Sequence, residues 1–255
     1  MKSYPWSGKR CWLVGASSGI GAACAMELSL QGAKVAISAR NGAALEQMVQ
    51  EHPDAGFFPV VADVCSQTSL QLAYAKIREA WGGIDLLLYL AGNYKPARAW
   101  ELESSVAQEI LEVNYMGAVR SVECVLTDFL ERKSGQIALT SSIAGLRGLP
   151  KSLYYGPSKA ALTHFAEILR LDLAPKGITV QVIHPGFVAT PLTAQNDFAM
   201  PHLLQPSQAA KLLVQGLQKD HFEIHFPKAF TRRFHWLRCL PYSWYFPLIR
   251  KATNV

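Results

Sequence analysis

The sequence predicts an α/β fold in which helices cover both faces of one parallel β-sheet. Short apolar runs alternate with longer runs of helical character along most of the chain, which is the pattern of a doubly wound parallel sheet. The run Ile84–Leu90 is largely apolar, as expected for a strand that is buried on both of its faces. A glycine-rich turn, Gly15–Gly21, joins the first strand to the first helix.

Local signals bound these elements. Gly32 follows the first helix, and Pro206 with Ser207 precedes the last one, which are typical stop and start residues. The expected strands are Cys11–Val14, Lys34–Ser38, Phe57–Val61, Ile84–Leu90, Gln136–Thr140, Thr179–Ile183 and Phe222–Phe226. The expected helices are Ile20–Gln31, Ala43–Gln50, Ser69–Trp81, Glu101–Glu131 as one helix or more, a helix that carries Tyr155, and Gln208–Gln218.

Length and composition suit a single domain. A chain of 255 residues, half of them apolar, can bury a full core and is not expected to be disordered. No apolar run reaches the ~18 residues needed to span a bilayer, and the polar start Met1–Arg10 does not resemble a secretory signal. The five cysteines are scattered without a metal-type pair, which favours reduced thiols in the cytoplasm and predicts no metal site.

The positive charge is concentrated at one end. The formal net charge is +6, and the segment 228–255, here called the tail, carries six basic residues and no acidic ones. The other basic residues equal the 19 acidic residues in number. A nucleic-acid-binding protein would more often carry its charge on a folded face, so we expect no nucleic-acid partner. We divide the chain into a folded domain, 1–227, and a basic, aromatic extension, 228–255.

Three residues suggest proton-transfer chemistry. Tyr155 and Lys159 are four residues apart, so on a helix both side chains leave the same face. An isolated tyrosine has a pKa of ~10, and a close ammonium group lowers that pKa by favouring the phenolate. Ser142 follows the strand-like run that ends at Thr140. A strand end that faces a helix start would bring both hydroxyl groups over one carbonyl oxygen.

A Tyr–Lys pair at this spacing also occurs by chance on helix surfaces, so the pair alone is weak evidence. Tyr154 competes for the same role, but the residue four positions on is Ser158, not a lysine. We therefore expect Tyr154 to pack in the interior or to line the substrate wall. The serine and the glycine-rich turn are what raise Tyr155 and Lys159 above chance.

Together these motifs resemble the short-chain dehydrogenase/reductase family over about residues 9–227. The turn spacing G-x-x-x-G-x-G is similar to that of the single-domain oxidoreductase branch and unlike that of the epimerases. The resemblance implies a Rossmann-like NAD(P)-binding catalytic domain in which Ser142 binds the carbonyl oxygen, Tyr155 donates the proton and Lys159 lowers its pKa. It also implies that Asn114 holds a water on the proton path, with a helix kink of no chemical role as the alternative.

The resemblance places the cofactor along several segments. The glycine turn and the following helix N-terminus would hold the phosphates, an acidic residue after the third strand would bind the adenine, and a Pro-Gly turn would lie along the nicotinamide. A simple helix N-cap is the alternative role for Asp63, and 191–204 is the expected substrate lid. The implied cofactor-binding residues are Gly15, Ser17, Ser18, Gly19, Ile20, Gly21, Arg40, Asp63, Val64, Ala91, Gly92, Tyr155, Lys159, Pro185, Gly186, Val188 and Thr190.

The end of the second strand predicts the type of nicotinamide cofactor. Enzymes that prefer NAD usually place an acidic residue there, whereas this chain has Ala39 followed by Arg40. A guanidinium group can bind a 2′-phosphate with two hydrogen bonds. We therefore expect NADP(H) to be preferred over NAD(H), with a solvated surface arginine as the alternative.

Two positions depart from the family pattern. Val14 and Leu90 stand where relatives carry a threonine and an asparagine that tie neighbouring strands together. We expect an apolar contact to replace this polar one. His184, just before the Pro-Gly turn, is a candidate base, but its position favours a buried packing role.

The tail mixes basic and aromatic residues, and Pro241 and Pro247 are expected to break it into short pieces. This mixture suits a membrane interface, and packing on the domain or on a partner subunit is the alternative. Its aromatic residues include Phe230, Phe234, Trp236, Tyr242, Trp244, Tyr245 and Phe246.

These observations lead to one expected function and two alternatives. We expect an NADPH-dependent oxidoreductase that transfers a hydride between the nicotinamide and a carbonyl or secondary alcohol, with a lipophilic substrate if the tail contacts lipid. The resemblance also implies a homodimer or homotetramer. The cysteine pattern favours a cytoplasmic location, at the inner face of a membrane if the tail binds lipid. The alternatives are a non-catalytic NADP(H)-sensing protein and a membrane-surface interaction protein on the same fold.

Overall fold

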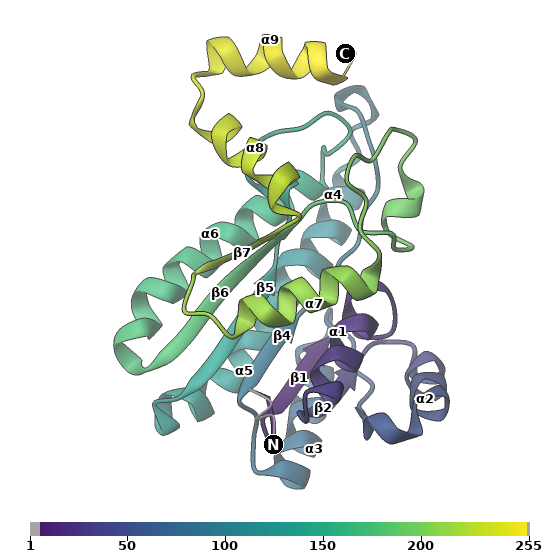
Figure 1. The fold of residues 1–255 in the computed structure, drawn as a ribbon, viewed down its shortest axis with the longest axis vertical. Helices are drawn as coiled ribbons and strands as arrows, with labels where there is room; N and C mark the ends of the chain where they lie inside the picture. The colour runs from purple at the N-terminus through teal and green to yellow at the C-terminus, as the bar shows by residue number, and fades with distance from the viewer. Residues whose placement is uncertain (1–5, 254–255) are drawn as a thin grey trace.

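The computed structural model describes residues 6–253, which form a seven-stranded sheet with helices on both faces (Figure 1). The strand order is β3-β2-β1-β4-β5-β6-β7, and every pairing is parallel. Parts of two predicted segments, residues 1–5 and 254–255, lie outside the described residues. The strands are β1 (Arg10–Val14), β2 (Lys34–Ser38), β3 (Phe58–Pro59), β4 (Leu86–Tyr89), β5 (Gly135–Thr140), β6 (Ile178–Pro185) and β7 (Glu223–Phe226).

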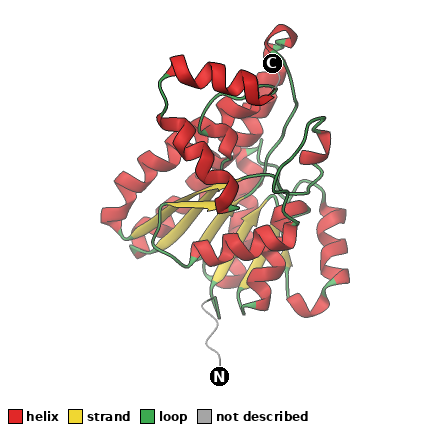
Figure 2. Cartoon of the chain, turned by 45° about the horizontal axis from the view of Figure 1, so that its top comes forward, coloured by secondary structure: helices red, strands yellow, loops and turns green. Residues whose placement is uncertain are grey.

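The helices form a layer on each side of the sheet (Figure 2). Buried side chains of α1, α2 and α7 pack on one face, and those of α3, α5 and α6 pack on the other. This arrangement confirms the predicted doubly wound α/β fold in one domain. The helices are α1 (Gly19–Leu30), α2 (Gly42–Glu51), α3 (Gln67–Trp81), α4 (Ser104–Leu111), α5 (Gly117–Arg132), α6 (Tyr155–Leu173), α7 (Pro206–Leu217), α8 (Lys228–Cys239) and α9 (Tyr242–Thr253).

Two predicted elements differ in extent from the structure. The expected strand Phe57–Val61 is reduced to β3, although the amides of Val60 and Ala62 still donate to the carbonyl oxygens of Ile37 and Ala39 at 2.9 and 3.1 Å. Pro59 is tolerated because β3 is the edge strand of the sheet. The expected helix Glu101–Glu131 consists of a short 3₁₀ turn, α4, the π-helical segment Glu112–Met116, and α5. The π-helical segment contains Asn114, so the residue that fits an α-helix poorly lies where the regular helix is interrupted.

The expected apolar contact between Val14 and Leu90 is wrong. Val14 packs in the core on the face covered by α3, α5 and α6, whereas Leu90 packs with the core on the opposite face. Successive side chains of a strand point to opposite faces, and Val14 pairs in register with Tyr89 rather than with Leu90. The two strand ends are tied by the backbone, since the carbonyl oxygen of Val14 accepts from the amides of Leu90 and Ala91 at 2.8 and 3.0 Å.

The tail folds into two helices that lie at one end of the molecule (Figure 1). Pro241 separates α8 from α9 as expected, but Pro247 lies within α9. Phe230, Tyr245 and Ile249 are buried against the domain. Among the described residues, no helix is both long enough and apolar enough to cross a bilayer. Packing on the domain therefore accounts for part of the tail's apolar surface.

Arg147 holds the two tail helices to the domain. Its Nη1 donates to the carbonyl oxygens of Leu237, Arg238 and Leu240 at 2.9, 3.0 and 2.6 Å. Its guanidinium carbon lies 4.5 and 4.2 Å from the ring centroids of Tyr242 and Tyr245. These carbonyl groups lie at the end of α8, where helical hydrogen bonding leaves acceptors free. A single cation thus satisfies the end of one helix and stacks on the start of the next.

Candidate active site

The segments after the parallel strands meet at the carboxyl edge of the sheet and bring the predicted polar residues together. Ser142 follows β5, and its Oγ accepts from the amide of Ala144 at 3.1 Å, which caps a short 3₁₀ turn. Tyr155 is the first residue of α6, and Lys159 lies one turn later. Ser142 and Tyr155 line the same cavity. The structure therefore brings the two hydroxyl-bearing residues to one site.

Lys159 is buried beneath this site. Lys159 is only 3 % exposed, and its Nζ donates to the carbonyl oxygen of Thr140 at 2.8 Å. Nζ lies 5.5 Å from the centroid of the Tyr155 ring. Burial lowers the pKa of Lys159 to about 7, because a charged amine is poorly solvated there. The amine can therefore gain or lose a proton near neutral pH.

The pKa of Tyr155 does not follow the expected direction. Burial raises it to about 12, the Ser142 hydroxyl acts in the opposite sense, and Tyr94 raises it further. The ring of Tyr94 meets that of Tyr155 edge to face, with centroids 5.2 Å apart. Desolvation by burial is the largest cause of the raised pKa of Tyr155 and of the lowered pKa of Lys159, and both shifts favour the neutral forms.

Asn114 lies beside the lysine and is fully buried. Its Nδ2 donates to the carbonyl oxygen of Asn93 at 3.0 Å and to Ser158 Oγ at 2.9 Å, and its Oδ1 accepts from the amide of Asn93 at 2.6 Å. A Cβ built on Gly92 would lie 3.6 Å from both Asn114 Oδ1 and Lys159 Nζ. The glycine therefore leaves room between the amide side chain and the amine.

The glycine-rich turn makes a close backbone junction. Gly15 has φ +92°, and a Cβ there would lie 2.4 Å from the amide nitrogen of Ala91. A Cβ on Gly21 would lie 2.1 Å from the carbonyl oxygen of Gly15. Side chains at these positions would therefore collide with backbone atoms. Ser17 is half-buried and Ser18 exposed, and Ser18 makes no side-chain cap to the N-terminus of α1. The amides of this helix start can donate hydrogen bonds to an anion.

The segment after β6 reaches this turn from the other side. A Cβ on Gly19 would lie 3.0 Å from Thr190 Cγ2, so Thr190 covers the helix start. Gly186 donates its amide to the carbonyl oxygen of Phe226 at 2.8 Å. Val188 is buried, and its carbonyl oxygen accepts from Thr193 Oγ1 at 2.5 Å. The Pro185–Thr190 segment therefore spans from β6 to the glycine turn. Ile20, in the first turn of α1, is partly buried against the core on this face of the sheet.

The residues predicted to bind the adenine end of the cofactor follow β2 and β3. Arg40 is exposed two residues after β2. Asp63 Oδ1 accepts from the amide of Cys65 at 3.0 Å, which closes a tight turn. The N-cap of α3 is Ser66, whose Oγ accepts from Ser69 at 3.2 Å. The alternative of Asp63 as a helix N-cap is therefore wrong. The Val64 side chain is buried against Gly117.

A cavity of about 720 Å³ opens over Ser142 and Tyr155. The predicted lid 191–204 contributes Leu192, Thr193 and Phe198 to its wall. Phe230, Phe234 and Leu237 of α8 also line this wall, which was not expected of any tail residue. Their spacing of four and three residues is the pattern of one helix face, and it was the available signal.

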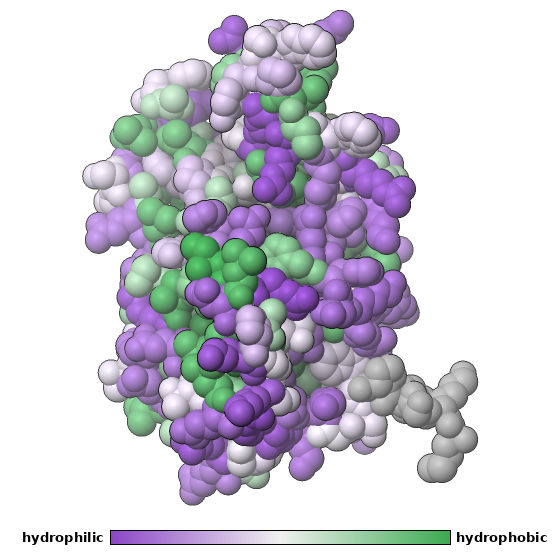
Figure 3. Space-filling view, turned by 90° about the vertical axis from the view of Figure 1, so that its left-hand side faces the viewer, coloured by the Kyte–Doolittle hydropathy of each residue, from purple (hydrophilic) through white to green (hydrophobic). Residues whose placement is uncertain are grey.

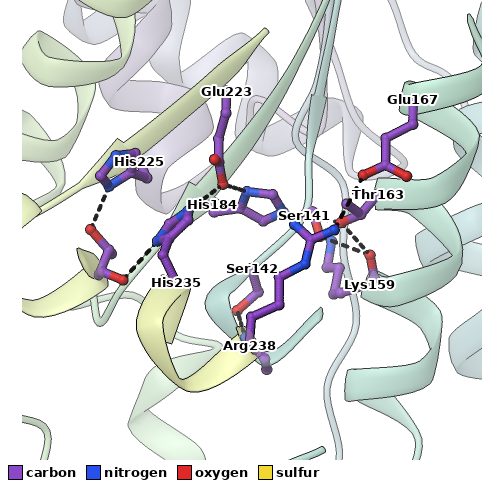
Figure 4. A network of polar contacts seen from close by, with 12 residues as sticks. Ser141, Ser142, Lys159, Thr163, Glu167, His184, Glu223, His225, His235 and Arg238 are labelled. Atoms are coloured by element: carbon purple, nitrogen blue, oxygen red, sulfur yellow. Dashed lines mark hydrogen bonds and ion pairs between the residues drawn. The ribbon is translucent and has the colours of Figure 1, made fainter. Parts of the chain in front are cut away.

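His184 has the buried packing role that was expected, and it belongs to a polar network (Figure 4). Its Nε2 lies 3.0 Å from Thr163 Oγ1, and its Nδ1 donates to Glu223 Oε1 at 2.5 Å. His235 Nε2 donates to the same oxygen at 2.8 Å. Burial disfavours the Glu223 carboxylate, yet the bonds from both imidazoles bring its pKa down to about 2. The network connects α6 through β6 and β7 to the tail helix α8.

Tyr154 packs in the interior, as expected. Its hydroxyl accepts from the amide of Glu103 at 2.7 Å and donates to the carbonyl oxygen of Glu101 at 2.9 Å. Within residues 6–253, no three His, Cys, Asp or Glu side chains gather as a metal site would require.

The chain resembles known oxidoreductases in sequence and structure. Residues 9–200 match the short chain dehydrogenase family. An uncharacterized oxidoreductase of Myxococcus xanthus is 37% identical over 218 residues, covering 84% of this chain and 86% of that protein. The 3-dehydrosphinganine reductase of Danio rerio is 30% identical over 242 residues, covering 88% of this chain and 73% of that protein. A crystal structure of a variant actinorhodin polyketide ketoreductase with NADPH superposes with a TM-score of 0.78 at 26% identity, covering 86% and 95%.

The Glu223 network predicts a pH-dependent contribution to stability. Since the folded-state pKa lies below the ordinary value of 4.5, the carboxylate stabilises the fold above about pH 4.5, and this is lost as the pH falls towards about 2. Glu223→Gln should lower the free energy of unfolding by roughly 2 to 3 kcal/mol at pH 7, measured by urea denaturation. The deficit should shrink progressively from pH 4.5 to pH 3. Glu46→Gln, on an exposed helix surface, is the matched control. An equal deficit at all pH values would contradict the assigned role of Glu223.

Proposed function

Because the chain belongs to the short-chain dehydrogenase family, an NAD(P)-dependent class of oxidoreductase, we propose that it is an NADPH-dependent reductase of lipophilic carbonyl compounds. The observation that carries this proposal is the convergence of Ser142 and Tyr155 on one largely apolar cavity, with the Lys159 amine beneath the tyrosine ring. The relatives add support, since one is named for reducing 3-dehydrosphinganine and a ketoreductase of the same fold was solved with NADPH.

The chain's residues fit a dinucleotide along the carboxyl edge of the sheet. The glycine turn allows backbone contact with phosphate because any Cβ at Gly15 or Gly21 would fill that space. Asp63 and Val64 would hold the adenine end, and Ala91 and Gly92 would line the adjoining part of the nucleotide. Pro185, Gly186, Val188 and Thr190 would hold the nicotinamide end. When bound, the reduced nicotinamide supplies the hydride.

Ser142 and Tyr155 supply the hydrogen bond and the proton that the reaction requires. Ser142 donates a hydrogen bond to the carbonyl oxygen and stabilises the negative charge that develops there. Tyr155 donates its phenolic proton to that oxygen as the carbon receives hydride, so a C–H and an O–H bond form and the carbonyl becomes an alcohol. A phenol with a raised pKa remains a strong enough acid for this step, because an alkoxide is a stronger base than a phenolate.

Lys159 and Asn114 restore the proton to Tyr155. The lysine amine, whose pKa of about 7 allows exchange near neutrality, favours the phenolate when it is protonated. Asn114 borders the space left by Gly92 next to the amine, and a water in that space would join the amine to solvent. This is the role we assign to the interrupted helix.

The role of Tyr155 is tested by a single hydroxyl deletion. Tyr155→Phe should bind NADPH with unchanged affinity but lose at least about a hundredfold in kcat, since general acid catalysis contributes at least that factor. Nucleotide fluorescence titration and NADPH oxidation measure the two quantities. Tyr154→Phe is the matched control, because its hydroxyl bonds only to the backbone in the interior, and it should keep its kcat. Full turnover by Tyr155→Phe would exclude the proposed mechanism.

Arg40 carries the proposed preference for NADP(H). It is exposed at the end of β2 and has no ion-pair partner among residues 6–253, so its guanidinium group is available for a 2′-phosphate. Arg40→Asp should raise the KM for NADPH about tenfold or more and should leave that for NADH unchanged or lower. Steady-state kinetics with both nucleotides tests this, and Arg40→Gln separates loss of attraction from added repulsion. Equal changes for both nucleotides would leave Arg40 as a solvated surface residue.

We also propose that the tail's outer surface contacts anionic lipid. Trp236, Trp244 and Phe246 are more than half exposed, and the tail projects from the domain with apolar side chains at its surface beside hydrophilic ones (Figure 3). Aromatic rings and cations together favour the interface of an anionic membrane. We assign oligomerisation to α5 and α6 instead, where Ile168 and Leu171 of α6 are exposed.

Vesicle flotation tests the lipid contact. The protein should bind phosphatidylserine vesicles, lose binding at high salt, and lose it when Trp236, Trp244 and Phe246 are all changed to Ser. Trp100→Ser removes an equally exposed tryptophan outside the tail and should bind like the parent. Light scattering of the lipid-free protein reports the oligomeric state of each variant. Unchanged binding of the triple variant, or dissociation of an oligomer by it, would assign this surface to something other than lipid.

A further inference from the structure

The cavity over Ser142 and Tyr155 is lined by charges of one sign. The charged residues in its wall are Arg98, Lys151 and Arg233, and no aspartate or glutamate lines it. Lys151 is neutralised by Asp197, with which it forms an ion pair. Arg98 lies over the ring of Trp100 with its guanidinium carbon 5.7 Å from the centroid. Neither Arg98 nor Arg233 forms a side-chain ion pair among the described residues. The Arg98 backbone amide does donate to Glu101 Oε2 at 2.7 Å, and the pKa of Asp197 is lowered first by its hydrogen bond with Lys151 and also by the charge of Arg98. Arg233 is therefore the less compensated of the two cations that border the cavity.

The rest of the wall is mainly apolar and continuous. Four phenylalanine rings form a chain, with centroid separations of 5.9 Å from Phe198 to Phe187, 5.4 Å from Phe187 to Phe230 and 5.1 Å from Phe230 to Phe234. These rings come from the Pro-Gly segment, the lid and α8, so three separate elements contribute to one surface. Leu237 and Ile249 of the tail extend it. Such a wall takes the apolar body of a ligand by removing both surfaces from water.

Arg233 places positive charge at this apolar wall. It lies between Phe230 and Phe234 in the sequence of α8, and all three residues line the cavity. Arg233 is exposed, so it lies at the rim of the cavity, where solvent screens part of its charge. A cation there stabilises an anionic ligand group and disfavours a cationic one. The cavity volume of about 720 Å³ lies within the roughly 300–1,000 Å³ of sites that hold drug-sized molecules.

From these observations we propose that the substrate is an amphipathic carbonyl compound that carries an anionic group at a distance from the reacting carbon. The inference rests on the proposed reductase function and specifies its substrate class. The carbonyl group lies at Ser142 and Tyr155, the apolar body lies along the four phenylalanine rings, and Arg233 with Arg98 binds the anionic group. Arg233 and Arg98 are thus specificity-determining residues, and Arg233 belongs to the tail.

A matched pair of substrates tests the anionic group. The probes are a medium-chain fatty acid with an aldehyde at its far end and the methyl ester of the same compound, which differ only in the charge. With NADPH, the full-length enzyme should show a kcat/KM for the acid at least about tenfold above that for the ester. Arg233→Gln and Arg98→Gln should each lower the acid-to-ester ratio several-fold with little change in the kcat/KM for the ester.

Arg232→Gln is the control for this experiment. Arg232 is the neighbouring arginine of α8, is exposed and does not line the cavity, so its loss removes the same charge from the helix without altering the wall. This variant should keep the parent's acid-to-ester ratio. An equal fall in the ratio for Arg232→Gln and Arg233→Gln would show a general effect of the tail's charge and would overturn the specific assignment.

A binding measurement gives a readout that does not depend on turnover. Isothermal titration with a saturated medium-chain fatty acid should show binding to the parent and to Arg232→Gln, and weaker binding to Arg233→Gln. The two proposals then fail in different ways. Reduction of the ester as efficiently as the acid, with no fatty-acid binding, would overturn the anionic substrate and leave the reductase standing. Fatty-acid binding without reduction of any carbonyl would instead contradict the reductase.

Discussion

The common direction of the seven strands is the constraint on which the site depends. Since every pairing in the sheet is parallel, each strand delivers its following segment to the same edge. The glycine turn after β1, Gly92 after β4, Ser142 after β5 and the Pro-Gly turn after β6 come together for this reason. The junction is tight at its centre, where Gly15 and Ala91 meet through backbone atoms. Helices on both faces hold the strands in this order.

Burial then sets the chemistry at that edge. Lys159 is almost inaccessible and has one carbonyl oxygen as its hydrogen-bond acceptor, so its ammonium form is poorly stabilised. Tyr155 experiences the same desolvation, which disfavours its phenolate. Both residues are therefore closer to their neutral forms than they would be in water.

The sequence was informative where local patterns determine structure. Strand and helix order, the glycine turn and the pairing of Ser142 with Tyr155 all follow from periodicity and spacing. It was less informative where burial and side-chain direction decide. The contact between Val14 and Leu90 failed because alternation along a strand places these two side chains on opposite faces. The direction of the Tyr155 pKa failed because spacing reveals a neighbouring charge but not the loss of water around it.

The tail was the least predictable part, because its position depends on contacts distant in sequence. Arg147 lies about ninety residues before the carbonyl groups that it binds, as the separations of 90 to 93 residues show. Glu223 and His235 fix the middle of α8 to the sheet, and Arg238 lies 3.7 Å from Glu167 of α6. In each of these pairs, no local sequence motif connects the two residues. Composition showed that the tail is basic and aromatic, but not which of its rings face inward.

The contacts of Arg147 with α8 and α9 have a consequence for shortened or fused forms of the protein. Arg147 stands in the loop that begins with Ser142, so the carboxyl-terminal helices and the proposed oxyanion-binding residue share one short stretch of chain. Proteolysis near residue 240, or a bulky fusion that displaces α9, would remove the α9 residues that line the cavity. It would also remove the contacts that Arg147, in the loop that follows Ser142, makes with α9. A protein shortened after residue 240 would keep the α8 residues of the cavity wall and lose Ile249, Ala252 and Thr253 of α9.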